Sequence, residues 1–133
     1  AVGKANQLPN TDLNYKPVPY IENMATAYLA ADLIIARSGA VTCSEVNALG
    51  KYALFIPLPI GNGEQKVNAR LVTEQSRGEL VDQGEFTPEW IANHLDRLLK
   101  NSDMASPAGN GSDLLATEKL VALMEEALKV KAK

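Results

Sequence analysis

A turn of small residues between a predicted strand and a predicted helix carries the clearest chemical signal in this sequence. Residues 33–36 are apolar, Ser38, Gly39 and Ala40 follow them, and a helical pattern is established by Thr42. The first N–H groups of a helix have no partner within the helix, and the helix dipole adds positive potential there. Because glycine and alanine also let a ligand approach the backbone closely, this pattern predicts a phosphate-binding corner.

Two charged side chains flank this corner. Glu45 lies further along the predicted helix, where its carboxylate can accept hydrogen bonds from the paired hydroxyls of a ribose, as acidic residues do in other nucleotide sites. Arg37 precedes the turn and either neutralises a phosphate or pairs with a nearby carboxylate such as Asp32 or Glu45. The same strand, turn and helix also fit a close-packed connection without a ligand, since this arrangement recurs throughout α/β folds.

The composition is that of one soluble globular domain. The chain has 133 residues, of which 46% are hydrophobic and 22% are charged, and this is long enough for one domain with a buried core. The net charge of −3 argues against a nucleic-acid-binding surface. No apolar run approaches the ~20 residues of a membrane span, and the N-terminus carries no secretory signal, so we expect a cytoplasmic location.

The single cysteine and the single histidine indicate neither a metal site nor a catalytic group. Cys43 cannot form an internal disulfide, and its place in the predicted helix fits a small core residue. His94 lies outside the apolar side of its predicted helix, which favours a solvated side chain, and no residue near it completes a catalytic triad. We therefore expect no catalytic residue, no metal and no cofactor in this chain.

The predicted elements alternate between strands and helices. Polar, turn-rich residues 1–17 indicate a connection, and residues 101–112 indicate a loop. The predicted strands are residues 33–36, 53–57 and 78–81, and the predicted helices are residues 22–31, 42–49, 64–75, a segment starting at Thr87-Pro88, and 113–130. This alternation predicts an α/β fold with a Rossmann-like parallel sheet and helices on both faces. Because such sheets commonly have more strands, we expect the first strands of the domain to be missing here.

The hydrophobic spacing also predicts which sides of two helices face the core. In the helix at residues 64–75, the expected inward residues are Val67, Leu71 and Val72. In the helix that starts at Pro88, they are Trp90, Ile91, Leu95, Leu98 and Leu99.

Three blocks of the sequence resemble the C-terminal, donor-binding domain of the bacterial lipid II synthases, which are GT-B glycosyltransferases. The blocks are Tyr20-Ile-Glu-Asn-Met24, Arg37-Ser-Gly-Ala-Val-Thr-Cys-Ser-Glu45, and Ala53-Leu-Phe-Ile-Pro57 followed by Gly63-Glu-Gln65 and Asn68-Ala69. The likeness runs over most of residues 1–100. It implies that residues 1–133 are part of a C-terminal UDP-sugar-binding domain, the C-terminal half of a GT-B fold, and that the N-terminal acceptor domain is absent from this chain.

The resemblance implies how a nucleotide would be held. Ile21 would lie against the uracil of UDP-N-acetylglucosamine and offer backbone hydrogen bonds to its edge. Ala40, Val41 and Thr42 would present backbone groups to the diphosphate and the sugar. Glu45 would hold the ribose hydroxyls.

The resemblance also implies a sugar contact at the start of the helix at residues 64–75. Gln65 and the preceding Glu64 would contact hydroxyls of the N-acetylglucosamine. The family often has glutamine in place of Glu64, and a carboxylate can accept a hydrogen bond from a sugar hydroxyl but cannot donate one. The helix dipole would favour a glutamate at this position even without a ligand.

The implied activity is transfer of N-acetylglucosamine from UDP to undecaprenyl-pyrophosphoryl-N-acetylmuramoyl-pentapeptide, the step from lipid I to lipid II in peptidoglycan synthesis. The general base and the lipid-acceptor site would lie in the absent domain, so this chain alone is expected to be inactive and to make no membrane contact itself. The full-length protein would be peripheral on the cytoplasmic face of the bacterial membrane. Two alternatives are a stand-alone UDP-N-acetylglucosamine-binding subunit with a membrane-bound partner, and another GT-B glycosyltransferase.

Overall fold

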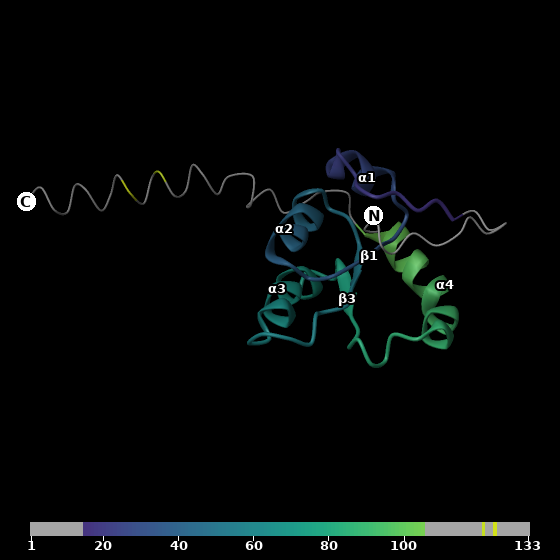
Figure 1. The fold of residues 1–133 in the computed structure, drawn as a ribbon. Helices are drawn as coiled ribbons and strands as arrows, with labels where there is room; N and C mark the ends of the chain where they lie inside the picture. The colour runs from purple at the N-terminus through teal and green to yellow at the C-terminus, as the bar shows by residue number, and fades with distance from the viewer. Residues whose placement is uncertain (1–14, 106–120, 122–123, 125–133) are drawn as a thin grey trace, which may run out of the picture.

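The computed structural model shows an α/β fold built on a three-stranded parallel sheet (Figure 1). It describes residues 15–105 together with Val121 and Met124. The elements follow the chain as α1 (Met24–Ala30), β1 (Ile34–Ala36), α2 (Ala40–Ala48), β2 (Ala53–Phe55), α3 (Glu64–Thr73), β3 (Gly78–Leu80) and α4 (Pro88–Met104). The predicted fold class is therefore confirmed.

The central strand β2 is buried on both faces of the sheet. The strands lie in the order β1-β2-β3, and both neighbouring pairs are parallel. Side chains from α1, α2 and α3 form one buried cluster around Phe55, whereas Leu98 of α4 packs with Leu54 and Ile56 on the other face. Accordingly, α2 and α3 lie on one side of the sheet and α4 on the other (Figure 1). This double coverage explains why the sequence of β2 is apolar throughout.

The start of α4 agrees with the sequence, but its end does not. The Thr87 side chain accepts a hydrogen bond from the backbone N–H of Trp90 at 3.1 Å, and Pro88 occupies the first helical turn. The helix then continues to Met104, although the sequence predicts a loop from residue 101 onward.

Tertiary hydrogen bonds account for the extra turn of α4. Asn101 Nδ2 donates to Glu79 Oε1 at 3.1 Å, and the Ser102 hydroxyl donates to the carbonyl oxygen of Asp32. Asparagine and serine disfavour helix interiors because they bond to their own backbone. Here their side chains bond to other segments of the fold instead, so the last turn remains helical.

The inward side of α3 also differs from the prediction. Val67 and Leu71 are 60% and 66% exposed, whereas Ala69 and Val72 are 0% and 1% exposed. The inward positions are 65, 68, 69 and 72, which are spaced as one side of a helix. Val72 is therefore inward as predicted, whereas Val67 and Leu71 are not. Two of the inward positions are polar residues that hydrogen-bond to neighbouring loops, so hydrophobicity alone does not identify this side. In α4, Leu98 is buried as predicted, but Leu95 is 38% exposed.

Some predicted elements lie outside the described residues. These are most of the connection at residues 1–17, the loop beyond residue 105, and the helix predicted at residues 113–130 apart from Val121 and Met124. Within the described part of the chain, no helix combines the length and the hydropathy that crossing a bilayer requires.

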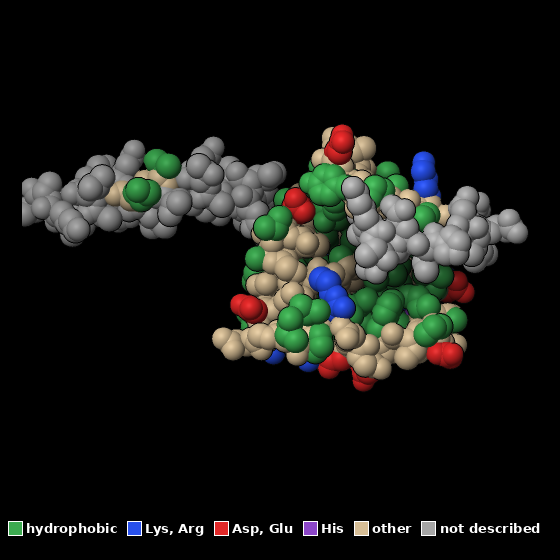
Figure 2. All heavy atoms as spheres, in the orientation of Figure 1, with side chains coloured by type: hydrophobic (Ala, Val, Ile, Leu, Met, Phe, Trp, Pro, Cys, Tyr) green, Lys and Arg blue, Asp and Glu red, His purple; other side chains and the backbone are tan. Residues whose placement is uncertain are grey.

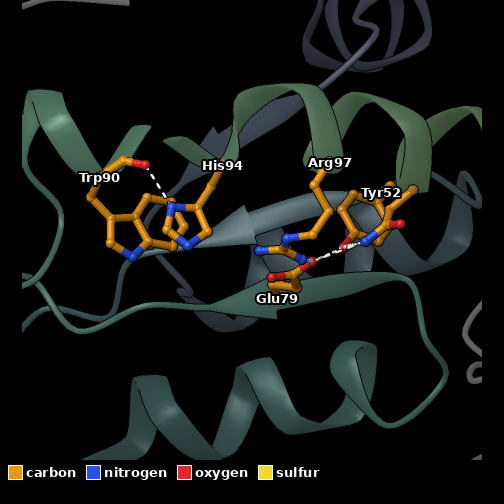
Figure 3. Close-up of polar contacts among 6 residues, drawn as sticks. Tyr52, Glu79, Trp90, His94 and Arg97 are labelled. Atoms are coloured by element: carbon orange, nitrogen blue, oxygen red, sulfur yellow. Dashed lines mark hydrogen bonds and ion pairs between the residues drawn. The ribbon is translucent and has the colours of Figure 1, made fainter. Parts of the chain in front are cut away.

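A polar cluster ties α4 to the starts of β2 and β3 (Figure 3). The Tyr52 hydroxyl donates to Glu79 Oε1 at 2.7 Å, Asn101 donates to the same oxygen, and Arg97 forms an ion pair with this carboxylate. The hydrogen bond from Arg97 is the main reason why the pKa of Glu79 lies below its usual value, against the opposing effect of burial. Burial, and then the bond to Glu79, raises the pKa of Tyr52 to about 12. The cluster therefore stabilises the fold with Glu79 ionised.

Replacing Glu79 with Gln is expected to lower the free energy of unfolding at pH 7 by about 1–2 kcal/mol, because a charged acceptor becomes neutral. The pKa of Glu79 is lowered on folding, so its stabilisation is present above the unfolded-state pKa and is lost as the pH falls through the folded-state value. The difference in the free energy of unfolding between the parent and Glu79→Gln should therefore be largest above about pH 5 and should decrease below about pH 4.

Urea unfolding at pH 7, 5 and 3, followed by circular dichroism, measures this difference. Glu85→Gln is the matched control, because Glu85 is an exposed glutamate between β3 and α4, and its replacement should change stability by less than about 0.5 kcal/mol. A Glu79→Gln difference that stays constant from pH 7 to pH 3 would contradict the assignment.

Candidate functional site

The predicted site residues gather around one edge of the sheet. All three strands are parallel, so their carboxyl ends lie at the same edge, where ligands bind in open α/β sheets. Ser38 and Gly39 follow β1, residues 57–63 follow β2, and residues 82–84 follow β3. The corner predicted from residues 38–42 therefore adjoins two further loops.

The first turn of α2 presents backbone donors that no described side chain caps. The helix begins at Ala40, two residues earlier than predicted, with Gly39 as its N-cap and no side-chain hydrogen bond at the cap. The first bond into the helix runs from Cys43 N–H to the Gly39 carbonyl oxygen at 3.0 Å. The N–H groups of Ala40, Val41 and Thr42 precede this bond, so an anion can accept from them.

This corner combines open space with a buried hydroxyl. A Cβ placed on Gly39 would meet no described atom within 4 Å, and the side chain of Val41 is 71% exposed. Ser38 is fully buried, and its hydroxyl has no hydrogen-bond partner within the described part of the chain. An unsatisfied buried hydroxyl costs free energy in the folded chain.

Glu45 is half-buried on the same helix, beside Tyr28 of α1. Tyr28 packs in the core with Cys43, and its pKa is raised first by burial and then by the negative charge of Glu45, while an interaction with Thr42 lowers it. Thr42 and Glu45 are three positions apart and so share one side of α2. The structure therefore brings the Glu45 carboxylate close to the open helix start.

Gln65 is held by the loop that follows β2. Its Oε1 accepts a hydrogen bond from the backbone N–H of Leu58 at 2.9 Å. A backbone N–H can only donate, so the amide must be oriented with Oε1 toward Leu58 and Nε2 away from it. Gln65 therefore directs the N–H donors of Nε2 away from this loop, while Oε1 keeps one further lone pair.

The same loop turns at two glycines. Gly61 and Gly63 have φ angles of +81° and +76°, which glycine adopts without strain, and Gly63 is the N-cap of α3. The carboxylate of the exposed Glu64 lies over this turn, because its Oε1 is 3.1 Å from the place that a Cβ on Gly61 would take. Turn geometry is sufficient to explain both glycines.

A cavity of about 420 Å³ opens between the loops that follow β2 and β3. It is lined by residues 57–61, Gly63, Lys66 and residues 82–84. Lys66 Nζ lies 2.7 Å from Asp82 Oδ1, and both side chains are more than half exposed. The cavity reaches the start of α3 at Gly63 and Lys66, but its lining includes none of residues 37–42.

Arg37 binds the ends of neighbouring strands. Its Nη1 donates to the carbonyl oxygens of residues 56 and 57 at 3.1 and 3.3 Å, and its Nη2 donates to Gln83 Oε1 at 2.8 Å. These partners replace the carboxylates of Asp32 and Glu45 that the sequence offers as ion-pair partners.

Asn68 is a site residue to which sequence reasoning assigns no role. Its Nδ2 donates to the carbonyl oxygen of Ser38 at 3.2 Å and so ties α3 to the corner before α2. Its presence in the third block of the resemblance was a usable signal. Gln83 has no such signal, because it lies in a short polar turn outside all three blocks.

The remaining candidates lie in less central places. Ile21 is half-buried in the segment that leads into α1. Cys43 is a buried core residue, as predicted, and burial raises the pKa of its thiol to about 11. His94 differs from the prediction: it is half-buried and stacks on Trp90 with ring centroids 4.1 Å apart (Figure 3).

Charges do not define the site by themselves. On the face drawn in Figure 2, acidic and basic side chains are scattered and form no large patch of one sign. Among the described residues, no group of three or more His, Cys, Asp or Glu side chains is placed to hold a metal ion.

Comparisons with known proteins find relatives in sequence and in fold. Relatives include the UDP-N-acetylglucosamine–N-acetylmuramyl-(pentapeptide) pyrophosphoryl-undecaprenol N-acetylglucosamine transferases of Bifidobacterium adolescentis and Streptomyces avermitilis. The first is 48% identical over 99 residues, covering 74% of this chain and 25% of the relative. The second is 40% identical over 140 residues, covering 96% and 38%. The chain therefore spans well under half the length of these relatives.

A solved structure shares the fold. The crystal structure of Acinetobacter baumannii MurG matches with a TM-score of 0.63 and 33% sequence identity, over 82% of this chain and 34% of that one. The family model described as the glycosyltransferase family 28 C-terminal domain matches residues 3–126. Because that match takes in all seven described helices and strands, the chain belongs to the glycosyltransferase family 28 C-terminal domain family.

Proposed function

We propose that this chain binds UDP-N-acetylglucosamine as the donor-binding part of a transferase that acts on undecaprenyl-pyrophosphoryl-N-acetylmuramoyl-pentapeptide. The observation that carries the proposal is the start of α2, which has open space at Gly39 and no side-chain cap within the described residues. Glu45 on the same helix supplies an acidic group next to it. The printed names of the relatives supply the choice of donor and acceptor.

In this proposal the diphosphate binds at the start of α2. The N–H groups of Ala40, Val41 and Thr42 and the helix dipole accommodate its negative charge. Transfer of the sugar leaves UDP with additional charge on its terminal phosphate. Donors that are already fixed in position stabilise this developing charge without reorganisation, which lowers the barrier of the transfer step.

Glu45 binds the ribose in this proposal. A carboxylate has two oxygens and accepts from both hydroxyls of a cis-diol at once. Tyr28 lies beside it, since the charge of Glu45 contributes to raising the pKa of Tyr28 after burial. Since the uracil is attached to the ribose, Ile21 before α1 is assigned to the base.

Gln65 and Glu64 contact the sugar. Gln65 Oε1 is occupied by Leu58 N–H, so Nε2 donates to an oxygen of N-acetylglucosamine. Glu64 is exposed beside it and, as an ionised carboxylate, only accepts from a hydroxyl. One donor and one acceptor at adjacent positions suit hydroxyls on neighbouring carbons of a pyranose.

The acceptor site and the general base are assigned to a second domain outside residues 1–133. The first strands of the present domain are also assigned to sequence outside this range. The proposal locates the full-length protein on the cytoplasmic face of the bacterial membrane, with the donor-binding part directed away from the lipid.

Replacing Glu45 with Ala is expected to weaken UDP binding by about 1–3 kcal/mol, because two charge-assisted hydrogen bonds to the ribose are lost. Titration calorimetry of the 133-residue chain with UDP and with 2′,3′-dideoxy-UDP measures the effect. The loss should appear with UDP and be nearly absent with the dideoxy analogue. Glu74→Ala, at the far end of α3, is the control. Equal affinities of Glu45→Ala and parent for UDP, with equal melting temperatures, remove Glu45 from the site.

Replacing Gln65 with Ala is expected to weaken binding of UDP-N-acetylglucosamine but not of UDP, because only the sugar contact is lost. The expected loss is about 1 kcal/mol, which is roughly fivefold in affinity. Gln75→Ala is the control, since Gln75 is an exposed glutamine beyond the other end of α3. If affinity for both ligands falls by the same factor, Gln65 has a structural role only.

Replacing Gly39 with Ala is expected to weaken UDP binding while leaving the fold intact. The φ and ψ angles of Gly39 are −63° and 152°, which alanine adopts freely, and its Cβ would enter open space. The free energy of unfolding should change by less than about 1 kcal/mol. The methyl group would obstruct a bound phosphate, at a cost of about 1–3 kcal/mol in affinity. Undiminished UDP affinity in a folded Gly39→Ala chain would argue against this corner as the diphosphate site.

A further inference from the structure

The side chain of Arg37 bridges the carboxyl ends of the three strands. Arg37 follows β1 directly, its Nη1 bonds the carbonyl oxygens of Ile56 and Pro57 after β2, and its Nη2 bonds Gln83 after β3. All three acceptors are neutral oxygens. A planar guanidinium with donors fixed in a fork suits this task, whereas a lysine ammonium presents a single point charge.

One of these bonds acts on the peptide group that orients Gln65. The carbonyl of Pro57 and the N–H of Leu58 belong to the same peptide unit, which is planar and rigid. Arg37 Nη1 binds the carbonyl at 3.3 Å, and the N–H on the opposite side of the unit donates to Gln65 Oε1 at 2.9 Å. The orientation of this plane therefore links the guanidinium to the Gln65 amide.

We propose that Arg37 is a positioning residue for the sugar contact: it fixes the Pro57–Leu58 peptide group, which in turn directs Nε2 of Gln65 toward the donor sugar. Gln83 holds the guanidinium from the side of β3, so it contributes to the same arrangement. This inference rests on the proposed function, because it assigns Gln65 to the sugar. It differs from a phosphate contact, in which the charge of Arg37 would act directly on the ligand.

The two roles predict different binding patterns, because UDP lacks the sugar. The sugar increment is defined here as the ratio of the dissociation constant for UDP to that for UDP-N-acetylglucosamine. A positioning role lowers the sugar increment and leaves UDP affinity unchanged. A phosphate contact lowers the affinity for both ligands and is largely retained when lysine replaces arginine.

The experiment is titration calorimetry of the 133-residue chain and its variants with UDP and UDP-N-acetylglucosamine. Arg37→Met removes the charge and the bonds, Arg37→Lys keeps the charge, and Gln83→Leu removes one anchor of the guanidinium. Arg97→Met is the matched control, because Arg97 bonds Glu79 at the opposite edge of the sheet. Both Arg37 variants should reduce the sugar increment about fivefold while UDP affinity stays within about twofold. Gln83→Leu should reduce the increment less, and Arg97→Met should leave it unchanged.

A double-mutant cycle tests the link to Gln65 directly. If Arg37 acts through Gln65, adding Gln65→Ala to Arg37→Lys should cause little further loss of the sugar increment. If the double variant loses the product of the two single-variant reductions in the sugar increment, the inference is overturned. A sugar increment in Arg37→Lys equal to that of the parent would overturn it too. So would an equal loss of affinity for both ligands in Arg37→Met, if Arg37→Lys restores that affinity.

Failure of the proposed function gives a different result. A parent chain that binds neither ligand, or binds both with equal affinity, overturns the assignment of Gln65 and the inference together. A parent with a clear increment that Gln65→Ala removes, and that both Arg37 variants keep, overturns only the inference. If Arg37→Met does not fold, Arg37→Lys and Gln83→Leu still decide between these outcomes.

Discussion

The backbone groups that leave a parallel sheet at its carboxyl edge need hydrogen-bond partners, and this requirement organises the site. Strand pairing satisfies the groups within β1, β2 and β3, but not those in the loops that follow. Arg37 binds two of the carbonyls after β2, Gln65 accepts from the N–H of Leu58, and Asn68 donates to the carbonyl of Ser38. Within the described residues, the N–H groups at the starts of α2 and α3 have no side-chain cap. The same bonds that hold the loops in place thus leave a set of donors for an anion.

Local patterns in the sequence predict most of the fold. The apolar run predicts β2, and the Thr87-Pro88 pair predicts the start of α4. Both can be located to within a few residues, because burial on both faces of a sheet and N-capping each require particular residue types at neighbouring positions. The inward side of α3 is not predictable in this way. Gln65 and Asn68 face inward to bond with loops, and these bonds depend on partners elsewhere in the fold. The last turn of α4 is not predictable for the same reason, since Asn101 donates a hydrogen bond to Glu79, which lies 22 positions away in the sequence.

In the candidate site, too, some residues are predictable from local sequence and others are not. The corner at residues 38–42 and Glu45 occupy one short segment, so their spacing carries the signal, and the resemblance adds Gln65. The partners of Arg37 lie 19, 20 and 46 positions away, and no periodicity or motif points to them. Sequence reasoning therefore identifies the groups that would touch a ligand more readily than the groups that hold them in place. The latter depend on how three loops meet at one sheet edge.

The polar groups at the two edges of the sheet differ in whether the protein itself supplies their hydrogen-bond partners. At the amino edge, Tyr52, Arg97 and Asn101 all donate to a single oxygen of Glu79, so the cluster is satisfied by the protein itself. At the carboxyl edge, the helix start is uncapped and the Ser38 hydroxyl has no described partner. A buried hydroxyl without a partner costs free energy in the unliganded fold. The buried clusters around β2 and the bonds at the amino edge offset this cost. A ligand that satisfies the carboxyl edge should consequently stabilise the folded chain as it binds.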